Sequence, residues 1–195
     1  MEDTASTRQP VLRKDAARNR CRIMDAARAL VHTGRLVQLN AVAQAADVGV
    51  GTVYRHFPTP EALVEALAAD RFTALIDQAE QSAAAPDALR GFLKAAVTAY
   101  LQDDAFAAAI VDPNPTTPEI QTLRHRLQDA FLELLARADA DGALHPALTV
   151  ADMMPLLCGI GFAIRHAADP DDPTLPDRYL SALLDGVLTR HAQAG

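Results

Sequence analysis

The chain has 195 residues, of which 50% are hydrophobic, so it is long enough to bury a sizeable core and to form one or two small domains. Its formal net charge of -7 disfavours, at first sight, a nucleic-acid partner, because proteins bind duplex DNA largely by neutralising its phosphates. No apolar run reaches the roughly 18 to 20 residues that span a bilayer, and the first residues lack the apolar stretch of a signal peptide. We therefore expect a globular, cytoplasmic protein.

The charge is unevenly distributed along the chain. Residues 1–58 hold nine Arg and Lys against five Asp and Glu, a net charge of +4, whereas residues 59–195 hold nine against twenty, a net charge of -11. The basic residues at the start are Arg8, Arg13, Lys14, Arg18, Arg20, Arg22 and Arg28. This asymmetry is typical of a chain whose first part meets DNA, although a solvated charged helix face has the same composition.

The periodicity of the apolar residues predicts an all-helical protein of about nine helices. Apolar residues recur at spacings of three and four almost everywhere, and no sustained period-two run is present. The first three helices are expected at residues 15–33, 39–46 and 50–56. Gly34 is placed to end the first of them, and residues 47–49 form a tight turn between the second and the third.

Six further helices are predicted from caps, prolines and apolar stripes. Thr59 suits the N-cap of the fourth helix and Pro60 suits its first position, where no hydrogen-bond donor is missed. Residues 112–118 contain three prolines and form a loop that ends where Thr117 and Pro118 start the next helix. The six helices are expected at 60–82, from Pro86 through Leu101, from Asp103 or Asp104 to Ile110, from Pro118 to Asp141, at 150–167 with Pro155 inside it, and at 177–191.

Motifs of catalysis and of metal binding are absent from the sequence. It has no Gly-rich phosphate loop, no HExxH and no nucleophile-elbow serine, so we expect no enzyme, no metal and no cofactor. Cys21 and Cys158 stand in separate helical patterns and are interpreted as small buried hydrophobic residues. The histidines lack the spacing of metal ligands on a shared helix face, namely His125, His145, His166 and His191. The aspartates lack the remaining ligands and the spacing of a calcium loop, namely Asp169, Asp171 and Asp172.

Residues 42–57, VAQAADVGVGTVYRHF, are the most informative part of the chain. A short helix, a tight turn and a second short helix form the helix-turn-helix geometry that fits the DNA major groove. Gly51 would let the backbone approach the duplex. The second helix also gathers groups that can bond phosphates or base edges, namely Thr52, Tyr54, Arg55 and His56. The alternative is that Tyr54 and His56 merely pack against the first helix.

The longer stretch AVAQAADVGVGTVYRHFPTPEALVEAL resembles the helix-turn-helix signature of the TetR repressor family, and RCRIMDAARALVHTG before it resembles the family's first helix. The resemblance covers residues 20–67, and its Gly-Thr-hydrophobic-Tyr-x-His-Phe core is specific. The segment LRGFLKAAVTAYL looks, less specifically, like the C-terminal domain of actinobacterial-type TetR regulators. The resemblance implies an all-helical homodimer with a three-helix DNA-binding domain at 1–58 and an effector-binding and dimerisation domain at 59–195.

The same resemblance implies roles for individual residues of the helix-turn-helix. Thr52, Tyr54 and His56 occupy positions that the family uses on phosphates, whereas base or backbone contacts are implied for Val50, Gly51 and Arg55. The full set of expected DNA contacts is Lys14, Asn40, Val50, Gly51, Thr52, Tyr54, Arg55 and His56.

Three positions depart from the family's pattern. Gln38 stands where a Thr usually caps the second helix, Asp47 replaces the usual Gly of the turn, and Pro60 replaces a Lys or Arg that commonly touches phosphate. Asp47 is a mild change, because aspartate tolerates the left-handed backbone conformation. Pro60 removes a cation and predicts weaker phosphate anchoring there, which Arg13, Lys14 and Arg18 could offset.

An effector pocket is expected between the fourth and eighth helices. Its candidate lining is Phe72, Phe92, Tyr100, Phe106, His125, Leu127, Phe131, Met153, Met154 and Leu157, each of which could equally be ordinary core. Tyr100 and His125 are the polar groups expected to orient a ligand. The acidic charge of this half favours neutral or cationic effectors.

The last two helices are the predicted dimer interface. Gly159 and Gly161 permit close helix approach, and the ninth helix carries an apolar stripe at helical spacing. The expected interface residues are Gly159, Leu180, Leu183, Leu184, Val187 and Leu188.

The sequence thus predicts a ligand-responsive transcriptional repressor that binds a palindromic DNA operator as a homodimer and is released by a small-molecule effector. The alternative is a small-molecule carrier or sequestering protein that keeps the DNA-binding head without reading DNA. Pro60 and the acidic total charge raise this alternative.

Overall fold

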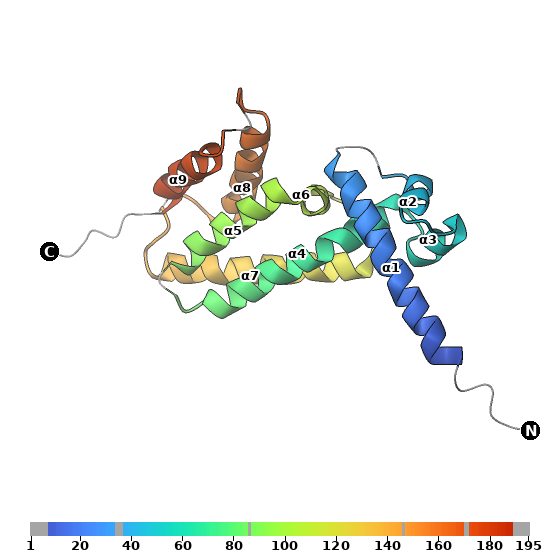
Figure 1. Cartoon of the computed structure of the whole chain (residues 1–195). Helices are drawn as coiled ribbons and strands as arrows, with labels where there is room; N and C mark the ends of the chain where they lie inside the picture. The colour runs from blue at the N-terminus through green and yellow to red at the C-terminus, as the bar shows by residue number, and fades with distance from the viewer. Residues whose placement is uncertain (1–7, 34–36, 86, 146, 170–171, 189–195) are drawn as a thin grey trace, which may run out of the picture. The chain divides into compact units, whose positions relative to one another are not determined.

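The computed structural model describes residues 8–33, 37–85, 87–145, 147–169 and 172–188, without the side chains of residues 8–14, Val150, Met154 and Cys158. Regular secondary structure in these ranges is helical throughout, and nine helices are present, which confirms the predicted all-α fold class. One isolated antiparallel bridge joins Leu144 and Leu188. The chain divides into two compact units, Met1–Ala68 and Ala69–Gly195. This boundary lies inside the fourth helix, whereas the domain limit expected from the sequence lies just before it (Figure 1).

The first unit is built from α1 (Arg8–His32), α2 (Leu39–Ala45), α3 (Val50–His56) and the beginning of α4 (Pro60–Ser82). α2 packs against both α1 and α3, so the apolar sides of the three helices form one hydrophobic core. The buried side chains include Ile23, Ala27, Leu39, Val42, Val53, Phe57, Leu63 and Leu67. α1 begins earlier than the sequence pattern indicated, since Pro10 stands in the first turn, where helical N–H groups have no partner in any case.

The tight turn between α2 and α3 depends on Asp47. Its backbone has φ of 49°, the left-handed conformation that was expected to be tolerated at this position. Arg22 of α1 holds the turn, because its Nη2 atom lies 3.1 Å from both the carbonyl oxygen and the Oδ2 of Asp47. Gln38, at the start of α2, makes no side-chain capping hydrogen bond. Arg22 therefore ties the turn to α1, whereas the sequence analysis had counted it only among the basic residues of the first part of the chain.

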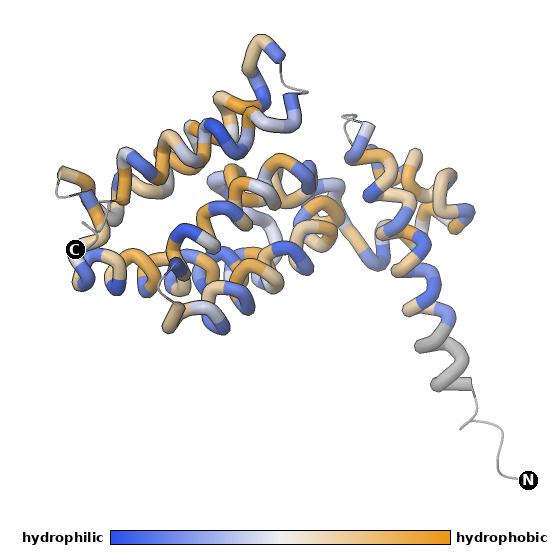
Figure 2. Tube along the Cα trace, turned by 60° about the vertical axis from the view of Figure 1, so that its left-hand side comes forward, coloured by the Kyte–Doolittle hydropathy of each residue, from blue (hydrophilic) through white to orange (hydrophobic). Residues whose placement is uncertain are grey.

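The second unit contains the rest of α4 together with α5 (Ala88–Gln102), α6 (Asp104–Val111), α7 (Pro118–Ala140), α8 (Val150–Arg165) and α9 (Leu175–Val187). Polar and hydrophobic residues alternate along most of the helices of the chain (Figure 2). α5 packs against α6, α7, α8 and α9 and is the central element of the unit. Its core includes Phe72, Leu93, Ile120, Leu135 and Met153, all fully buried.

Local capping chemistry explains most helix boundaries. The side chains of Thr59, Asp103 and Thr117 accept hydrogen bonds from backbone N–H groups three residues ahead, at 3.1, 2.9 and 3.4 Å respectively. At the C-terminal end of α7, Gly142 has φ of 66°, which glycine adopts without steric cost. The predicted start of the fifth helix at Pro86 lies outside the described residues.

The limits predicted for α9 were wrong at both ends. The helix begins at Leu175, because Pro176 fits its first turn, and it ends at Val187 rather than at residue 191. Leu188 is already extended, with φ of −98° and ψ of 129°, and the His145 N–H donates to the Val187 carbonyl at 2.8 Å. This pairing with a distant segment ends the helix.

α8 begins with a capping box and continues through Pro155. The Thr149 hydroxyl and the Thr149 N–H both donate to Oδ2 of Asp152, at 2.7 and 2.8 Å. These two hydrogen bonds lower the pKa of Asp152, since they favour its ionised form. Hydrogen bonds from the Thr174 N–H and hydroxyl, together with Arg178, likewise lower the pKa of Asp172 before α9. Both carboxylates therefore stabilise helix starts.

Cys21 is exposed on α1, so its expected burial was wrong. The second cysteine, Cys158, lies in α8, where its side chain is not described. In the part of the chain that the structure describes, no helix is long and apolar enough to cross a membrane. The same residues bring together no group of three His, Cys, Asp or Glu side chains that could hold a metal ion.

Candidate nucleic-acid interface and effector cavity

α3 is a short helix, and the buried residues on one side of it anchor it to the rest of the first unit. Val53 and Phe57 are both buried, and the Phe57 N–H donates to the Val53 carbonyl at 2.8 Å. The guanidinium carbon of Arg20 on α1 lies 4.9 Å from the centroid of the Phe57 ring, which is cation–π geometry. Since α3 has only seven residues, the burial of Val53 and Phe57 and the contact with Arg20 hold it in place, rather than its own hydrogen bonds.

The opposite side of α3 is open to solvent. Val50 is 44% exposed and Tyr54 is 49% exposed, although both carry large apolar groups that are usually buried. Gly51 and Arg55 are exposed beside them, whereas Thr52 and His56 are half-buried. A β-carbon at Gly51 would meet no atom within 4 Å, so internal packing does not require a glycine here. The exposed side of α3 is thus accessible from solvent.

Arg55 is held along the surface of its own helix. Its Nε donates to the Gly51 carbonyl at 3.1 Å, and its Nη2 donates to the Thr52 hydroxyl at 3.2 Å. Both bonds are solvent-exposed and easily exchanged for bonds to a ligand, because water competes with them. Thr52 can still donate its own hydroxyl hydrogen while it accepts from Arg55.

Ion pairs inside the first unit occupy part of its basic charge. Arg18 pairs with Asp15 at 3.6 Å, Arg28 pairs with Asp25 at 3.5 Å, and Arg22 pairs with Asp47. Among the other expected DNA contacts, Asn40 is exposed on α2, and Lys14 lies in α1 outside the described side chains. The cationic surface is therefore smaller than the residue count suggests.

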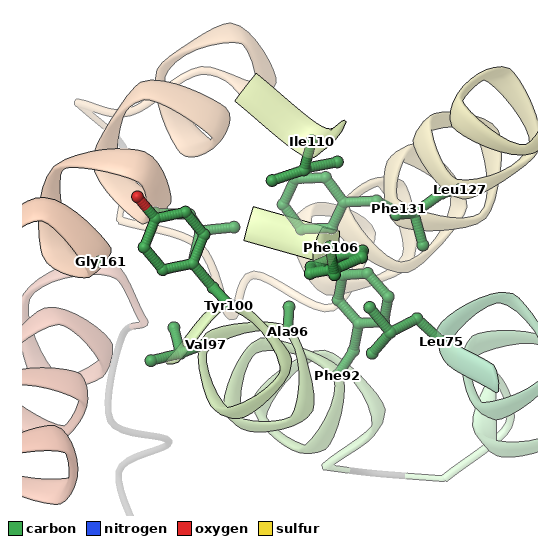
Figure 3. A pocket seen from close by; sticks show the side chains of 11 residues that line it. Leu75, Phe92, Ala96, Val97, Tyr100, Phe106, Ile110, Leu127, Phe131 and Gly161 are labelled. Carbon is green, nitrogen blue, oxygen red and sulfur yellow. The ribbon is translucent and has the colours of Figure 1, made fainter. Parts of the chain in front are cut away.

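A cavity of about 60 Å³ lies within the second unit (Figure 3). Its walls come from α4 to α8 and carry no charged side chain. The lining residues are Leu75, Phe92, Ala96, Val97, Tyr100, Phe106, Ile110, Leu127, Phe131, Leu157 and Gly161. The Phe92 and Phe131 rings stack at 5.3 Å between centroids on one side. The hydroxyl of Tyr100 lies on the far side of its ring from these phenylalanines, as Figure 3 shows.

Six of the ten residues expected at the pocket line this cavity: Phe92, Tyr100, Phe106, Leu127, Phe131 and Leu157. Phe72 instead packs behind it, with its ring 4.8 Å from that of Phe106. Met153 is buried elsewhere, and Met154 is outside the described side chains. His125 is exposed and does not line the cavity.

Ala96, Val97, Ile110, Leu75 and Gly161 line the cavity but were not identified from the sequence. Helical spacing could have indicated two of them, since Ala96 and Val97 follow Phe92 by four and five residues on α5.

Tyr100 is clamped between α8 and the cavity. A β-carbon at Gly161 would lie 2.6 Å from Cδ1 and Cε1 of the Tyr100 ring, so only glycine allows the ring this position. On α8 the guanidinium carbon of Arg165 lies 4.8 Å from the ring centroid, and its Nη2 donates to the Tyr100 carbonyl at 2.6 Å. Arg165 also pairs with Asp104 at 3.4 Å. The ring is therefore a fixed wall of the cavity.

Most residues expected at the dimer interface pack inside the protomer. Leu180, Leu184 and Val187 are buried because α9 lies against α5 and α8, and Leu183 and Leu188 are half-buried. Gly159 alone in that set is exposed. The apolar stripe of α9 thus packs largely within its own protomer. Its assignment to a dimer interface stays a prediction.

α8 exposes a different apolar face. Phe162 is 60% exposed and its ring stacks on His166 at 4.0 Å between centroids. Pro155 and Gly159 are exposed at the preceding helical positions of the same face. We call Pro155, Gly159, Phe162 and His166 the outer face of α8.

Comparison with protein families gives two matches that together cover most of the chain. Residues 23–67 match the model described as bacterial regulatory proteins, tetR family. Residues 84–189 match the model described as transcriptional regulator SbtR-like, C-terminal domain. The first match contains the helix-turn-helix. The second contains the outer face of α8 and every cavity-lining residue except Leu75.

Individual relatives agree with the family models. The HTH-type transcriptional repressor KstR of Mycobacterium tuberculosis is 36% identical over 113 residues, which cover 48% of this chain and 51% of KstR, about half its length. A TetR transcription regulatory protein from Mycobacterium vanbaalenii is 32% identical, with 91% of this chain and 99% of that chain covered and a TM-score of 0.52. The TetR transcriptional regulator SCO0520 of Streptomyces coelicolor is 28% identical, with 88% and 99% covered and a TM-score of 0.54. The helix-turn-helix signature, the helical C-terminal unit and these matches agree, and the chain belongs to the TetR family of transcriptional regulators.

Proposed function

We propose that this regulator binds a two-fold symmetric DNA operator as a homodimer, represses transcription there, and is released by a small molecule that enters the cavity of its second unit. The observation that carries the proposal is the exposed side of α3, where Tyr54 and Arg55 face solvent on a helix anchored by Val53. The name of KstR, a transcriptional repressor, supports repression as the mode of action.

DNA recognition is assigned to α3 in the major groove. Arg55 has a guanidinium that can bond guanine O6 and N7 in bidentate fashion once it leaves Gly51 and Thr52. The hydroxyls of Thr52 and Tyr54 and the ring of His56 bond phosphate oxygens, which fixes the register of the helix on the duplex. Val50 and Gly51, at the N-terminal end, allow close approach to the bases.

Dimerisation is assigned to the outer face of α8 rather than to the leucine stripe of α9. An exposed phenylalanine stacked on an exposed histidine is costly to leave in water, and a second copy of the same face covers it by two-fold symmetry. Gly159, one turn before Phe162, lets the two helix backbones approach closely.

Release is assigned to the cavity. Effector and operator compete if the effector favours a conformation whose two DNA-binding units no longer match the operator spacing. Such coupling amounts to about 1–3 kcal/mol and is reciprocal, so operator DNA must weaken effector binding by the same factor.

Selection of the purified protein against a random duplex DNA pool tests the proposal. We expect enrichment of a palindrome with half-sites about one helical turn or more apart, and an affinity for it that falls steeply with salt. A folded protein that enriches no sequence would contradict the proposal. Tight small-molecule binding by that protein would then favour a carrier or sequestering function.

Arg55→Ala provides a finer test on the selected operator. We expect it to weaken binding by about 1–3 kcal/mol and to relax base preference at one position, because a bidentate contact to one base pair is lost. Arg28→Ala removes the same charge from an exposed site of the same unit and serves as control. Equal weakening on all sequences would assign Arg55 to phosphate instead, which competition between operator and random duplex DNA measures.

A further inference from the structure

The inner cavity is too small to hold a complete effector. Its volume is about 60 Å³, whereas an apolar cavity of about 150 Å³ binds benzene and the pockets of drug-sized ligands measure about 300–1,000 Å³. A ligand that uses this cavity must therefore extend beyond it into a neighbouring space.

A surface groove of about 550 Å³ adjoins the cavity. Ile110, Leu127 and Phe131 line both volumes, so the groove and the cavity meet at these three side chains. Two of them, Leu127 and Phe131, lie four residues apart on α7 and point to the same side of it. A ligand that lies in the groove and moves these side chains aside reaches the inner cavity.

The groove differs from the cavity in its chemistry. Arg124 and Gln128, one turn apart on α7, add a guanidinium and an amide to its wall. The cavity has no charged side chain, and the hydroxyl of Tyr100 is turned away from its phenylalanines (Figure 3). The combined site therefore has an apolar inner end and a hydrogen-bonding outer end.

Arg124 is a fixed cation without an anionic partner among the described residues. Its Nη1 donates to the carbonyls of Ala109 and Asp112 at the end of α6, which holds the guanidinium in place. The Asp112 carboxylate is directed elsewhere and accepts the Asn114 N–H at 2.8 Å. Four other arginines of this unit pair with a carboxylate, namely Arg71, Arg126, Arg165 and Arg178. Arg137, in contrast, donates to the Ala83 carbonyl at 2.8 Å. A half-buried arginine of this kind beside an apolar cavity is suited to an anion.

We infer that the effector is an amphipathic molecule with an apolar end in the inner cavity and a carboxylate or similar acidic head group bonded to Arg124 and Gln128. This inference rests on the proposed function, since it specifies the ligand of the same cavity. It also revises the preference for neutral or cationic effectors drawn from the net charge, because local geometry at Arg124 outweighs the screened charge of the distant surface.

Octanoate and octan-1-ol are the probes, because they share one alkyl chain and differ in the head group. Isothermal titration of the full chain should give tighter binding of octanoate than of octan-1-ol. Arg124→Gln should weaken octanoate binding about tenfold or more and octan-1-ol binding less than twofold, since it removes only the charge-assisted bonds of the head group. Arg124→Lys should recover part of the octanoate affinity.

Arg126→Gln is the matched control. It removes the same charge two residues away on α7, where Arg126 pairs with Glu80 at 3.2 Å and lines neither volume. Unchanged octan-1-ol binding by Arg124→Gln shows that the cavity persists in the variant. Equal affinities of the wild-type chain for both probes, equal losses in the two arginine variants, or no binding of either probe would each overturn the inference.

Operator binding by the same preparations separates this inference from the proposed function. Head-group-dependent binding without release of operator DNA supports the ligand class and contradicts release by this site. A chain that binds no operator but binds octanoate through Arg124 supports the inference and contradicts the proposed function.

Discussion

Phe162→Glu should convert the proposed dimer into monomers and weaken operator binding by more than about a hundredfold. Buried aromatic anchors at interfaces contribute about 2 kcal/mol or more, and a carboxylate buried against its symmetry mate adds an uncompensated charge that costs several kcal/mol. Because Phe162 is 60% exposed in the protomer, the substitution leaves the core of the second unit intact. Sedimentation analysis and operator titration measure the two effects.

Val111→Glu is the control for this substitution. Val111 is a 52% exposed apolar residue of the same unit that lies on α6 rather than on α8, and it undergoes the same change of charge. If both variants remain dimeric, the outer face of α8 is not the interface. Loss of the dimer in both would indicate a general effect of charge.

Gly161→Ala should abolish the response to effectors while operator binding persists. The added methyl group would stand 2.6 Å from the Tyr100 ring, which must then move away from α8 into the cavity. Overpacking of this kind costs about 1–3 kcal/mol, and the displaced ring fills space that is needed by the apolar end of a ligand. Titration with octan-1-ol, which depends on the inner cavity, should show roughly a tenfold loss or more.

Gly91→Ala is the matched control, since Gly91 is an exposed helical glycine of α5 where a β-carbon meets no atom within 4 Å. Both substitutions raise helix propensity by similar amounts, so the difference between them isolates the contact with Tyr100. Equal octan-1-ol affinities in the two variants would show that the ring of Tyr100 does not control access to the cavity.

Helix limits that depend on local capping could be predicted from the sequence. Limits that depend on pairing with a distant segment could not. The caps at Thr59, Asp103 and Thr117 act within three residues, and each predicted start agrees with the structure. The end of α9 depends on the bridge between Leu144 and Leu188, which are far apart in the chain. No periodicity within α9 carries that information, and its end was therefore misplaced.

The candidate site shows the same division between local and distant information. The residues of α3 were identified because their spacing and chemistry lie within one short segment. The stripe of α9 indicated burial correctly, but a pattern of leucines cannot state whether its own chain or a second copy covers it. Within the protomer, the stripe packs against α5 and α8.

Arg124 and His125 illustrate how helical geometry could have improved the pocket assignment. His125 precedes Leu127 by two residues, about 200° around α7, so it points away from the side that carries Leu127 and Phe131. Arg124 lies three residues before Leu127, and Gln128 lies three residues before Phe131, so both line the groove with them. The polar character of His125 suggested it as a pocket residue, whereas the angular positions around α7 indicate its neighbour Arg124.

The contact between Arg22 and Asp47 has a consequence for how this helix-turn-helix can evolve. A glycine at position 47 would adopt the φ of 49° without strain and would need no partner, which would release Arg22 for other roles. With aspartate at 47, the arginine is committed to the turn. Substitutions at these two positions should therefore be epistatic, and among homologues the identity at one should constrain the identity at the other.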